Sequence, residues 1–398
     1  MSIKKTNIGK DSEEIIGVKS SFLSLIKNLD WRSYVMIAAL GLIWLLFAFL
    51  TDGIFVSARN ITTLFRQMTV VGVIAIGAVI VIITRQIDLS VGSVVALTAT
   101  VAAILRAWYG WPVIPTVFVA ICIGVATGAW HGFLTTKLRI PPFIATLGGM
   151  LLFRGIQLLI TQGMTIAPTG PSFQWIANGY LNAKYSTILI SLIYLVYIFT
   201  LLRTFQKGKK YGYKISFFSV ITKLVIVFVV LSLIIWIAFS YEGIPIPMLI
   251  LFGFMFLFRF IMTRTKFGRS LYAIGGNPDA ARLFGIKVKA NMFFAYVIMG
   301  FLTGTAGVIL ASRLDSASSN IGSFLELDVI AAAVIGGTSL FGGVGTVSGA
   351  LLGALIMASV DNGMSLMNLS TFIQYVVKAA ILLLAVWFDI STTKKQSL

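Results

Sequence analysis

Apolar stretches close to the length of a membrane crossing recur along almost the whole chain, and they constrain its fold more than any motif does. The stretches cover residues 34–50, 69–85, 91–106, 113–135, 141–162, 186–204, 218–241, 245–262, 292–312, 327–341, 345–361 and 371–389. A helix needs about 20 apolar residues to cross a bilayer core of about 30 Å, and several stretches are shorter or interrupted by Gly and Pro. We therefore predict an all-α polytopic membrane protein with ten to twelve transmembrane helices, some of them broken or re-entrant.

Composition excludes the alternative of several soluble domains. The chain of 398 residues is 58% hydrophobic and only 11% charged, whereas about a quarter of the residues in a soluble domain are charged. The sequence contains no G-x-x-x-x-G-K-[ST] phosphate loop and no H-E-x-x-H or G-x-S-x-G pattern. Cys122 and His131 are the only residues of their kinds, which excludes a disulfide framework and a multi-histidine metal centre. We expect no enzyme activity, no bound cofactor and no metal.

Lysine and arginine predict the orientation of the chain. Placing the N-terminus in the cytoplasm puts 22 of the 31 Lys and Arg residues on the cytoplasmic side and five on the other side. Cytoplasmic loops collect these residues, so we expect an even number of crossings and both termini in the cytoplasm. The predicted parts are a cytoplasmic segment 1–32, a transmembrane domain 33–390 and a cytoplasmic tail 391–398. Because the basic residues are dispersed between apolar spans, nucleic acid is not an expected partner.

The cytoplasmic loop 263–291 contains a well-punctuated short helix. Asn277 suits the N-cap, Pro278 the first helical position and Gly285 the C-terminal end, while Asp279 and Arg282 complement the helix dipole. A helix of about seven residues is unstable alone, so it either lies at the membrane interface or docks a cytoplasmic partner. The residues of this candidate coupling segment are Gly275, Gly276, Asn277, Pro278, Asp279, Ala280, Ala281, Arg282 and Gly285.

Acidic and other polar residues lie at the predicted ends of several spans. Carboxylates inside a bilayer are costly and usually face a pathway or a partner, although Asp88 can also be explained as a helix cap. Interrupted spans at 141–149 and 336–345 point to a substrate path. The candidate pathway or gating residues are Asp88, Ser90, Thr146, Arg154, Glu326, Asp328, Asp361 and Asn362.

Glycine recurs at every fourth position in two predicted helices, where it permits close helix packing. The packing residues are Gly124, Gly128 and Gly132 in one helix, and Gly345, Gly349 and Gly353 in the other. His131, beside the first row, is expected to be a packed polar residue and not a proton relay.

Several motifs in this order resemble a known family. They are Ile87–Ser93 (IDLSVGS), Pro142–Gly148 (PFIATLG), Phe153–Gly155 (FRG), Tyr272–Ile286, Glu326–Asp328 (ELD) and Val334–Leu340 (VIGGTSL). Together they are similar to the permease subunits of bacterial sugar ABC importers, the ribose/xylose/galactose branch of the branched-chain permease superfamily. Segments 361–367 and 163–240 are most similar to xylose permeases.

The resemblance implies a function and a set of partners. Two copies of the chain would form the pathway for a monosaccharide, expected to be D-xylose, in the bacterial inner membrane. A cytoplasmic ATPase subunit would hydrolyse ATP, and an extracytoplasmic sugar-binding protein would deliver the substrate. The family also places the Gly275–Ile286 segment against the ATPase. The alternatives are a secondary sugar transporter driven by H⁺ or Na⁺, which would use intramembrane carboxylates, and a channel or membrane scaffold.

Overall fold

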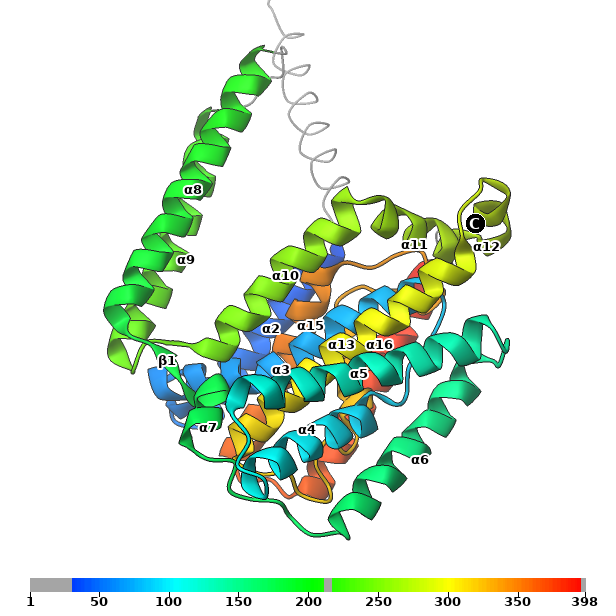
Figure 1. Ribbon diagram of the computed structural model, residues 1–398. Helices are drawn as coiled ribbons and strands as arrows, with labels where there is room; N and C mark the ends of the chain where they lie inside the picture. The colour runs from blue at the N-terminus through cyan, green and yellow to red at the C-terminus, as the bar shows by residue number, and fades with distance from the viewer. Residues whose placement is uncertain (1–30, 211–216, 395–398) are drawn as a thin grey trace, which may run out of the picture.

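The computed structural model describes residues 31–210 and 217–394 and consists almost entirely of helices (Figure 1). Residues 1–30 of the predicted segment 1–32 and residues 395–398 of the predicted tail 391–398 lie outside these ranges. The elements are α2 (Trp31–Leu50), η1 (Ile54–Val56), α3 (Ala58–Ile83), α4 (Val91–Ala107), α5 (Val113–Thr136), α6 (Pro142–Thr161), α7 (Pro171–Asn178), β1 (Tyr180–Leu181), α8 (Ala183–Lys210), α9 (Phe217–Ser240), β2 (Ile244–Pro245), α10 (Ile246–Arg264), α11 (Lys266–Gly276), α12 (Pro278–Leu283), α13 (Val288–Leu314), α14 (Leu325–Ile335), α15 (Val347–Leu366) and α16 (Thr371–Lys394).

The long helices run between two ends of the molecule, which we name after short helices that lie there. The α12 end carries α11 and α12, and the α7 end carries α7 and the antiparallel pair of β1 and β2 (Figure 1). Successive long helices alternate in direction between the two ends. Within the described ranges, seven helices are long and apolar enough to cross a membrane, and four shorter apolar helices accompany them.

Helices α3, α13 and α15 form the centre of the bundle. Burial covers 89% of the most apolar window of α3, 72% of that of α13 and 78% of that of α15. Helix α5 packs on α13 through glycine, because a Cβ atom at Gly124 or Gly128 would overlap the carbonyl oxygen of Gly300 or Tyr296. The close approach of the two backbones explains this row of small residues.

The second glycine row does not lie on one helix, as the sequence had indicated. Helix α15 begins at Val347, so Gly345 belongs to the connection before it. Gly349 and Gly353 are in α15, where a Cβ atom would overlap the carbonyl oxygens of Gly336 and Ala332. The helix therefore packs against α14 through two glycines and not three.

Each predicted apolar stretch coincides with a helix, but some boundaries were wrong. Helix α3 begins at Ala58, about three turns before the predicted start, because its first turns contain polar residues such as Arg59, Asn60 and Arg66. Helix α14 ends at Ile335, six residues before the end of the predicted span 327–341. Asp361, predicted to close a span, lies inside α15, which continues to Leu366.

Two of the crossings are only partly helical. Helix α4 is preceded by residues 84–90, which have no regular structure after the left-handed turn at Arg85. Helix α14 has 11 residues, about 16 Å at the helical rise, and is preceded by the irregular segment 315–324. We call residues 84–90 and 315–324 the two lead-ins. The first starts at the α12 end and the second at the α7 end.

Helices α8 and α9 form a hairpin that stands beside the main bundle (Figure 1). Only 6% of the most apolar window of α8 is buried. The hairpin is joined to the bundle at its base, where a small cluster contains Ile190, Ala238, Ile244 and Met248.

Candidate functional site

The two partly helical crossings meet inside the bundle. Gly92, in the first turn of α4, lies so close to Gly322 and Glu326 that a Cβ atom would overlap the Gly322 carbonyl and the Glu326 carboxylate. The N-termini of α4 and α14 are therefore neighbours in the interior. Helix N-termini carry partial positive charge, and discontinuous helices of this kind surround substrate sites in membrane transporters.

Asp88, Ser90 and Thr146 lie together at the first lead-in. Ser90 donates hydrogen bonds to the Asp88 Oδ1 atom from its backbone N–H at 2.8 Å and from its hydroxyl at 2.6 Å. The Thr146 hydroxyl of α6 is 3.3 Å from the Ile87 carbonyl oxygen. Ser90, and not Asp88, is the N-cap residue of α4, so the interpretation of Asp88 as the cap was wrong. Asp88 instead closes a local turn that holds the non-helical backbone.

Arg154, from the middle of α6, holds the second lead-in. Its Nη1 atom donates to the carbonyl oxygens of Ile321 at 2.9 Å and Ser319 at 3.3 Å. Backbone carbonyls outside a helix need such partners inside a membrane. Polar side chains thus hold both lead-ins. The first has hydrogen bonds within its own segment and a contact from Thr146 of α6, and the second has hydrogen bonds from Arg154 of the same helix.

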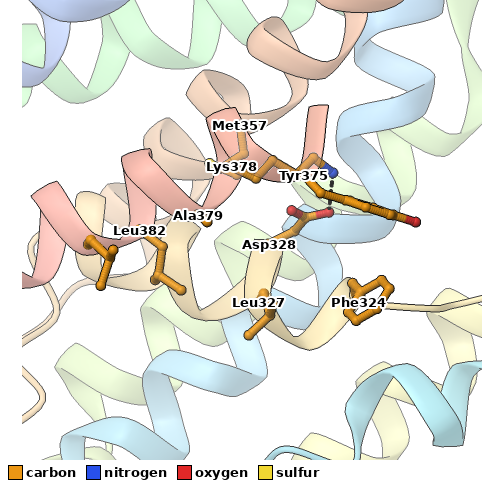
Figure 2. Close-up of a pocket in the computed structure, with 9 residues that line it drawn as sticks. Phe324, Leu327, Asp328, Met357, Tyr375, Lys378, Ala379 and Leu382 are labelled. Atoms are coloured by element: carbon orange, nitrogen blue, oxygen red, sulfur yellow. Dashed lines mark hydrogen bonds and ion pairs between the residues drawn. The ribbon is translucent and has the colours of Figure 1, made fainter. Parts of the chain in front are cut away.

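An ion triad, in which Asp328 is buried and the other two groups are partly exposed, lies on the other side of α14. Lys378 of α16 donates to Asp328 of α14 at 2.9 Å and approaches Asp361 of α15 at 2.9 Å. A cavity of about 400 Å³ lies next to it, lined mainly by apolar side chains together with Phe324 and Tyr375. Figure 2 shows the Asp328 carboxylate turned toward Lys378, with Phe324 and Tyr375 on the same side of the cavity. The triad joins three helices through charges within the membrane-spanning region.

Asn362, next to Asp361, belongs to a third polar group. Its side chain accepts from Asn60 Nδ2 at 2.7 Å and donates to Gln67 Oε1 at 3.3 Å. The eight candidate pathway residues therefore do not form one site. They divide among the crossing of the lead-ins, the ion triad and this link between α15 and α3.

Lys378 is the residue that the sequence did not single out as a site. It lies within the predicted apolar stretch 371–389. The available signal was its position in an apolar stretch while two carboxylates, Asp328 and Asp361, occupied neighbouring stretches, because charges in spans usually pair. His131 is buried and its ring lies 5.5 Å from that of Phe153 and 6.2 Å from that of Tyr296, as expected of a packed residue.

At the α12 end, the short helix has the N-terminal and C-terminal capping residues that the sequence predicted. The Asn277 side chain accepts from the backbone N–H groups of Asp279 and Ala280, each at 3.0 Å. Gly285 adopts a φ of +79° just after the helix. Two apolar side chains at the tip of the helix are strongly exposed: Leu283 is 89% and Phe284 is 87% exposed.

Helix α11 connects this tip to the bundle. Gly275 lies against the Ile83 carbonyl and the Gly343 backbone, where a Cβ atom would overlap both, whereas Gly276 has open space around its Cα. Arg85 donates to the Gly275 and Gly276 carbonyls at 2.6 and 2.5 Å. Burial raises the pKa of the Tyr272 hydroxyl, which donates to the Gly345 carbonyl at 2.7 Å.

No group of three or more His, Cys, Asp or Glu side chains suited to a metal ion occurs among the residues that the structure describes. The polar sites are ion pairs and hydrogen-bonded turns, arranged around non-helical backbone inside a bundle of apolar helices.

Comparison with known proteins identifies the chain at the family level. The sequence profile of the family described as "branched-chain amino acid transport system / permease component" matches residues 60–386. The chain belongs to this permease family. The match includes both lead-ins, the ion triad and the α12 tip, so all the sites described above are part of the family's common region.

Curated relatives cover almost the same length. The chain is 45% identical over 379 residues to the xylose transport system permease protein XylH of Escherichia coli strain K12, covering 95% of this chain and 96% of the relative. It is 42% identical to the XylH protein of Haemophilus influenzae, over 93% of this chain and 99% of the relative. The chain is 34% identical to the ribose import permease protein RbsC of Bacillus subtilis, over 84% of this chain and 86% of the relative. No solved structure matches the chain.

Proposed function

We propose that the chain imports a monosaccharide, D-xylose, as the membrane-spanning subunit of an ABC importer in the bacterial inner membrane. The xylose assignment is supported by the 45% and 42% identity to xylose permeases against 34% to a ribose permease. A separate cytoplasmic ATPase supplies the energy, an extracytoplasmic binding protein delivers the sugar, and two copies of the chain form the pathway.

The arrangement of the helices supports twelve crossings. Ten long helices cross in alternating directions, and each lead-in completes a crossing with α4 or α14. Twelve is an even number, so the start of α2 and the end of α16 both belong to the α12 end. Assigning this end to the cytoplasm agrees with the excess of Lys and Arg there.

The observation that carries the proposal is the exposed apolar tip of α12. Leu283 and Phe284 stand exposed at the end assigned to the cytoplasm, and burial of two such side chains by a partner contributes about 1.5–3 kcal/mol each. The Arg282 guanidinium, beside them, faces Asp279 at 3.5 Å on the exposed surface. We infer that the tip docks into a groove on the ATPase subunit.

The test is a double variant, Leu283→Asp/Phe284→Asp. We expect it to insert and melt like the wild type, because both side chains are exposed, yet to lose ATPase co-purification and xylose uptake. The control Met164→Asp makes the same kind of change at an exposed position near the α7 end and should keep both. Normal uptake with normal ATPase binding by the tip variant would contradict the proposal.

The structure also favours one second candidate, an ion-coupled secondary sugar transporter. Its support is the intramembrane triad of Lys378, Asp328 and Asp361, since paired ionisable residues in spans are typical of proton and ion relays. Uptake into proteoliposomes that contain the binding protein but no ATPase separates the two. Uptake driven by an ion gradient would establish the second candidate, whereas uptake that requires the ATPase and ATP would exclude it.

A further inference from the structure

A basic cleft lies at the α12 end, between the end of α5, the α12 helix and the start of α13. Its volume is about 730 Å³. Four of the residues that line it are cationic: Arg139, Arg282, Lys287 and Lys289. No carboxylate is among the lining residues. The nearby Asp279 faces Arg282 at 3.5 Å from the exposed surface of α12 and balances only one of the four charges.

The start of α13 adds to the positive potential. The helix has 27 residues, begins at Val288 and has no side-chain cap at Lys287. Its first-turn N–H groups and the positive end of its dipole therefore accompany the basic side chains. The two features together favour an anionic group in the cleft, because phosphate oxygens accept hydrogen bonds from Lys, Arg and helix N–H groups.

The cleft lies where two membrane-spanning helices end. Helices α5 and α13, whose ends line it, each meet the length and apolarity of a membrane span. Exposed aromatic rings occur in the last turn of α5, at Phe133, and in the second turn of α13, at Phe294, which are 43% and 54% exposed. A ligand suited to a basic cleft at the ends of such helices has an anionic head and an apolar tail.

We propose that the cleft binds the phosphate headgroup of an anionic phospholipid of the surrounding membrane. Basic pockets between helices at the cytoplasmic surface bind such headgroups, and each Lys or Arg near the surface contributes about 1 kcal/mol to the attraction. A free phosphate would use the cations but leave the apolar surfaces unused. The proposal requires that the helices span a membrane; it does not depend on transport or on the ATPase.

The experiment titrates the full-length, detergent-solubilised protein with phosphatidylglycerol or phosphatidylcholine and counts bound lipid by native mass spectrometry. We expect phosphatidylglycerol to bind about tenfold more tightly. The variant Arg139→Gln/Lys287→Gln/Lys289→Gln should lose this preference. Arg282 is left unchanged because it lies in α12, the helix that we propose docks onto the ATPase subunit. The matched control Arg264→Gln/Lys266→Gln/Arg269→Gln removes three exposed cations of the same end that do not line the cleft.

Each outcome decides the proposal. Loss of preference in the cleft variant alone, with melting temperatures equal to that of the control, supports it. Equal lipid preference in both variants overturns it. Displacement of the lipid by an equal concentration of inorganic phosphate would identify free phosphate as the ligand and overturn the proposal that the anion belongs to a lipid. Displacement by the purified ATPase subunit would show that a protein occupies the cleft, and would overturn it as well.

Discussion

The two partly helical crossings, α4 and α14, are built in the same way but held by different forces. Each consists of an irregular lead-in followed by a helix, and the two helices start at the same place, where Gly92 meets Gly322. The α4 crossing is held by local hydrogen bonds from Ser90 to Asp88 and by bonds from Arg85 to the backbone of α11. The α14 crossing is held by distant charges, from Arg154 on α6 and Lys378 on α16.

This difference concerns the neighbouring helices to which each crossing is bonded. The first lead-in is bonded to α11 through Arg85, whereas the contacts of the α14 crossing must be broken when α6 or α16 moves. A buried charge without its partner is costly, so we expect separation of α14 from α16 to be costly. The following variants test the contrast, beginning with the largest expected effect.

Removing the cation of the triad should affect stability most. Lys378→Met leaves Asp328 and Asp361 close together without a counter-charge, and breaking a buried pair costs about 3–5 kcal/mol. We expect a strongly lowered melting temperature in nanodiscs. The charge-free variant Asp328→Asn/Asp361→Asn/Lys378→Met should recover most of the loss. If the single variant melted like the wild type, the α14 crossing would not depend on these charges.

The contact between the crossings should come next. Gly92→Ala introduces a methyl group against the Gly322 carbonyl and Glu326, and overpacking of this kind costs about 1–3 kcal/mol. Gly155→Ala, in α6, is the control, because a Cβ atom there would meet nothing within 4 Å. Thermal melting of both variants measures the difference. A Gly92 variant as stable as the control would show that the lead-ins can separate freely.

Arg154→Lys should have a smaller effect. Both carbonyl oxygens, at Ser319 and Ile321, accept from the same Nη1 atom. A lysine ammonium retains the charge but ends one bond closer to the backbone, so we expect one carbonyl to lose its partner, a cost of about 1 kcal/mol. Hydrogen exchange of residues 315–324 should increase. The lead-in 84–90 should keep wild-type exchange, because the hydrogen bonds of Arg154 go to the other lead-in. Equal changes in both lead-ins would contradict the contrast.

The smallest effect is expected from acidification at the start of the second lead-in. Partial burial acts to raise the pKa of Asp315, but hydrogen bonds from Gln174, Thr169 and Gly170 outweigh it and lower the pKa below its usual value of 3.8. A carboxyl group with a depressed pKa in the folded protein stabilises it above the unfolded pKa, and this contribution is lost as the pH falls through the folded pKa. Melting should therefore become easier below a pH of about 4.

The variant Asp315→Asn provides the control for that measurement. It should remove the part of the pH dependence that this group contributes, while leaving the neutral-pH melting temperature only slightly lowered. An unchanged pH profile would show that the hydrogen bonds from Thr169 at 2.8 Å do not depend on the charge.

The sequence predicted the helices well because apolar stretches of this length have few alternatives in a membrane. It also predicted the α12 helix, since Asn277, Pro278 and Gly285 are local signals. It misplaced the start of α3, where Arg66 and its polar neighbours are paired at the α7 end and do not interrupt the helix. It missed the role of Lys378 because the partners at 328 and 361 are far away in the sequence. Local patterns specify elements, whereas pairing across helices depends on the packed fold.

The contact at Gly275 makes the α12 end mechanically stiff. One backbone position touches the end of α3, which leads into the α4 crossing, and also Gly343, in the connection between α14 and α15. Both contacts join main chain to main chain, so no flexible side chain absorbs a displacement. A displacement of α11 at Gly275 would therefore act on the backbone next to both broken crossings at once.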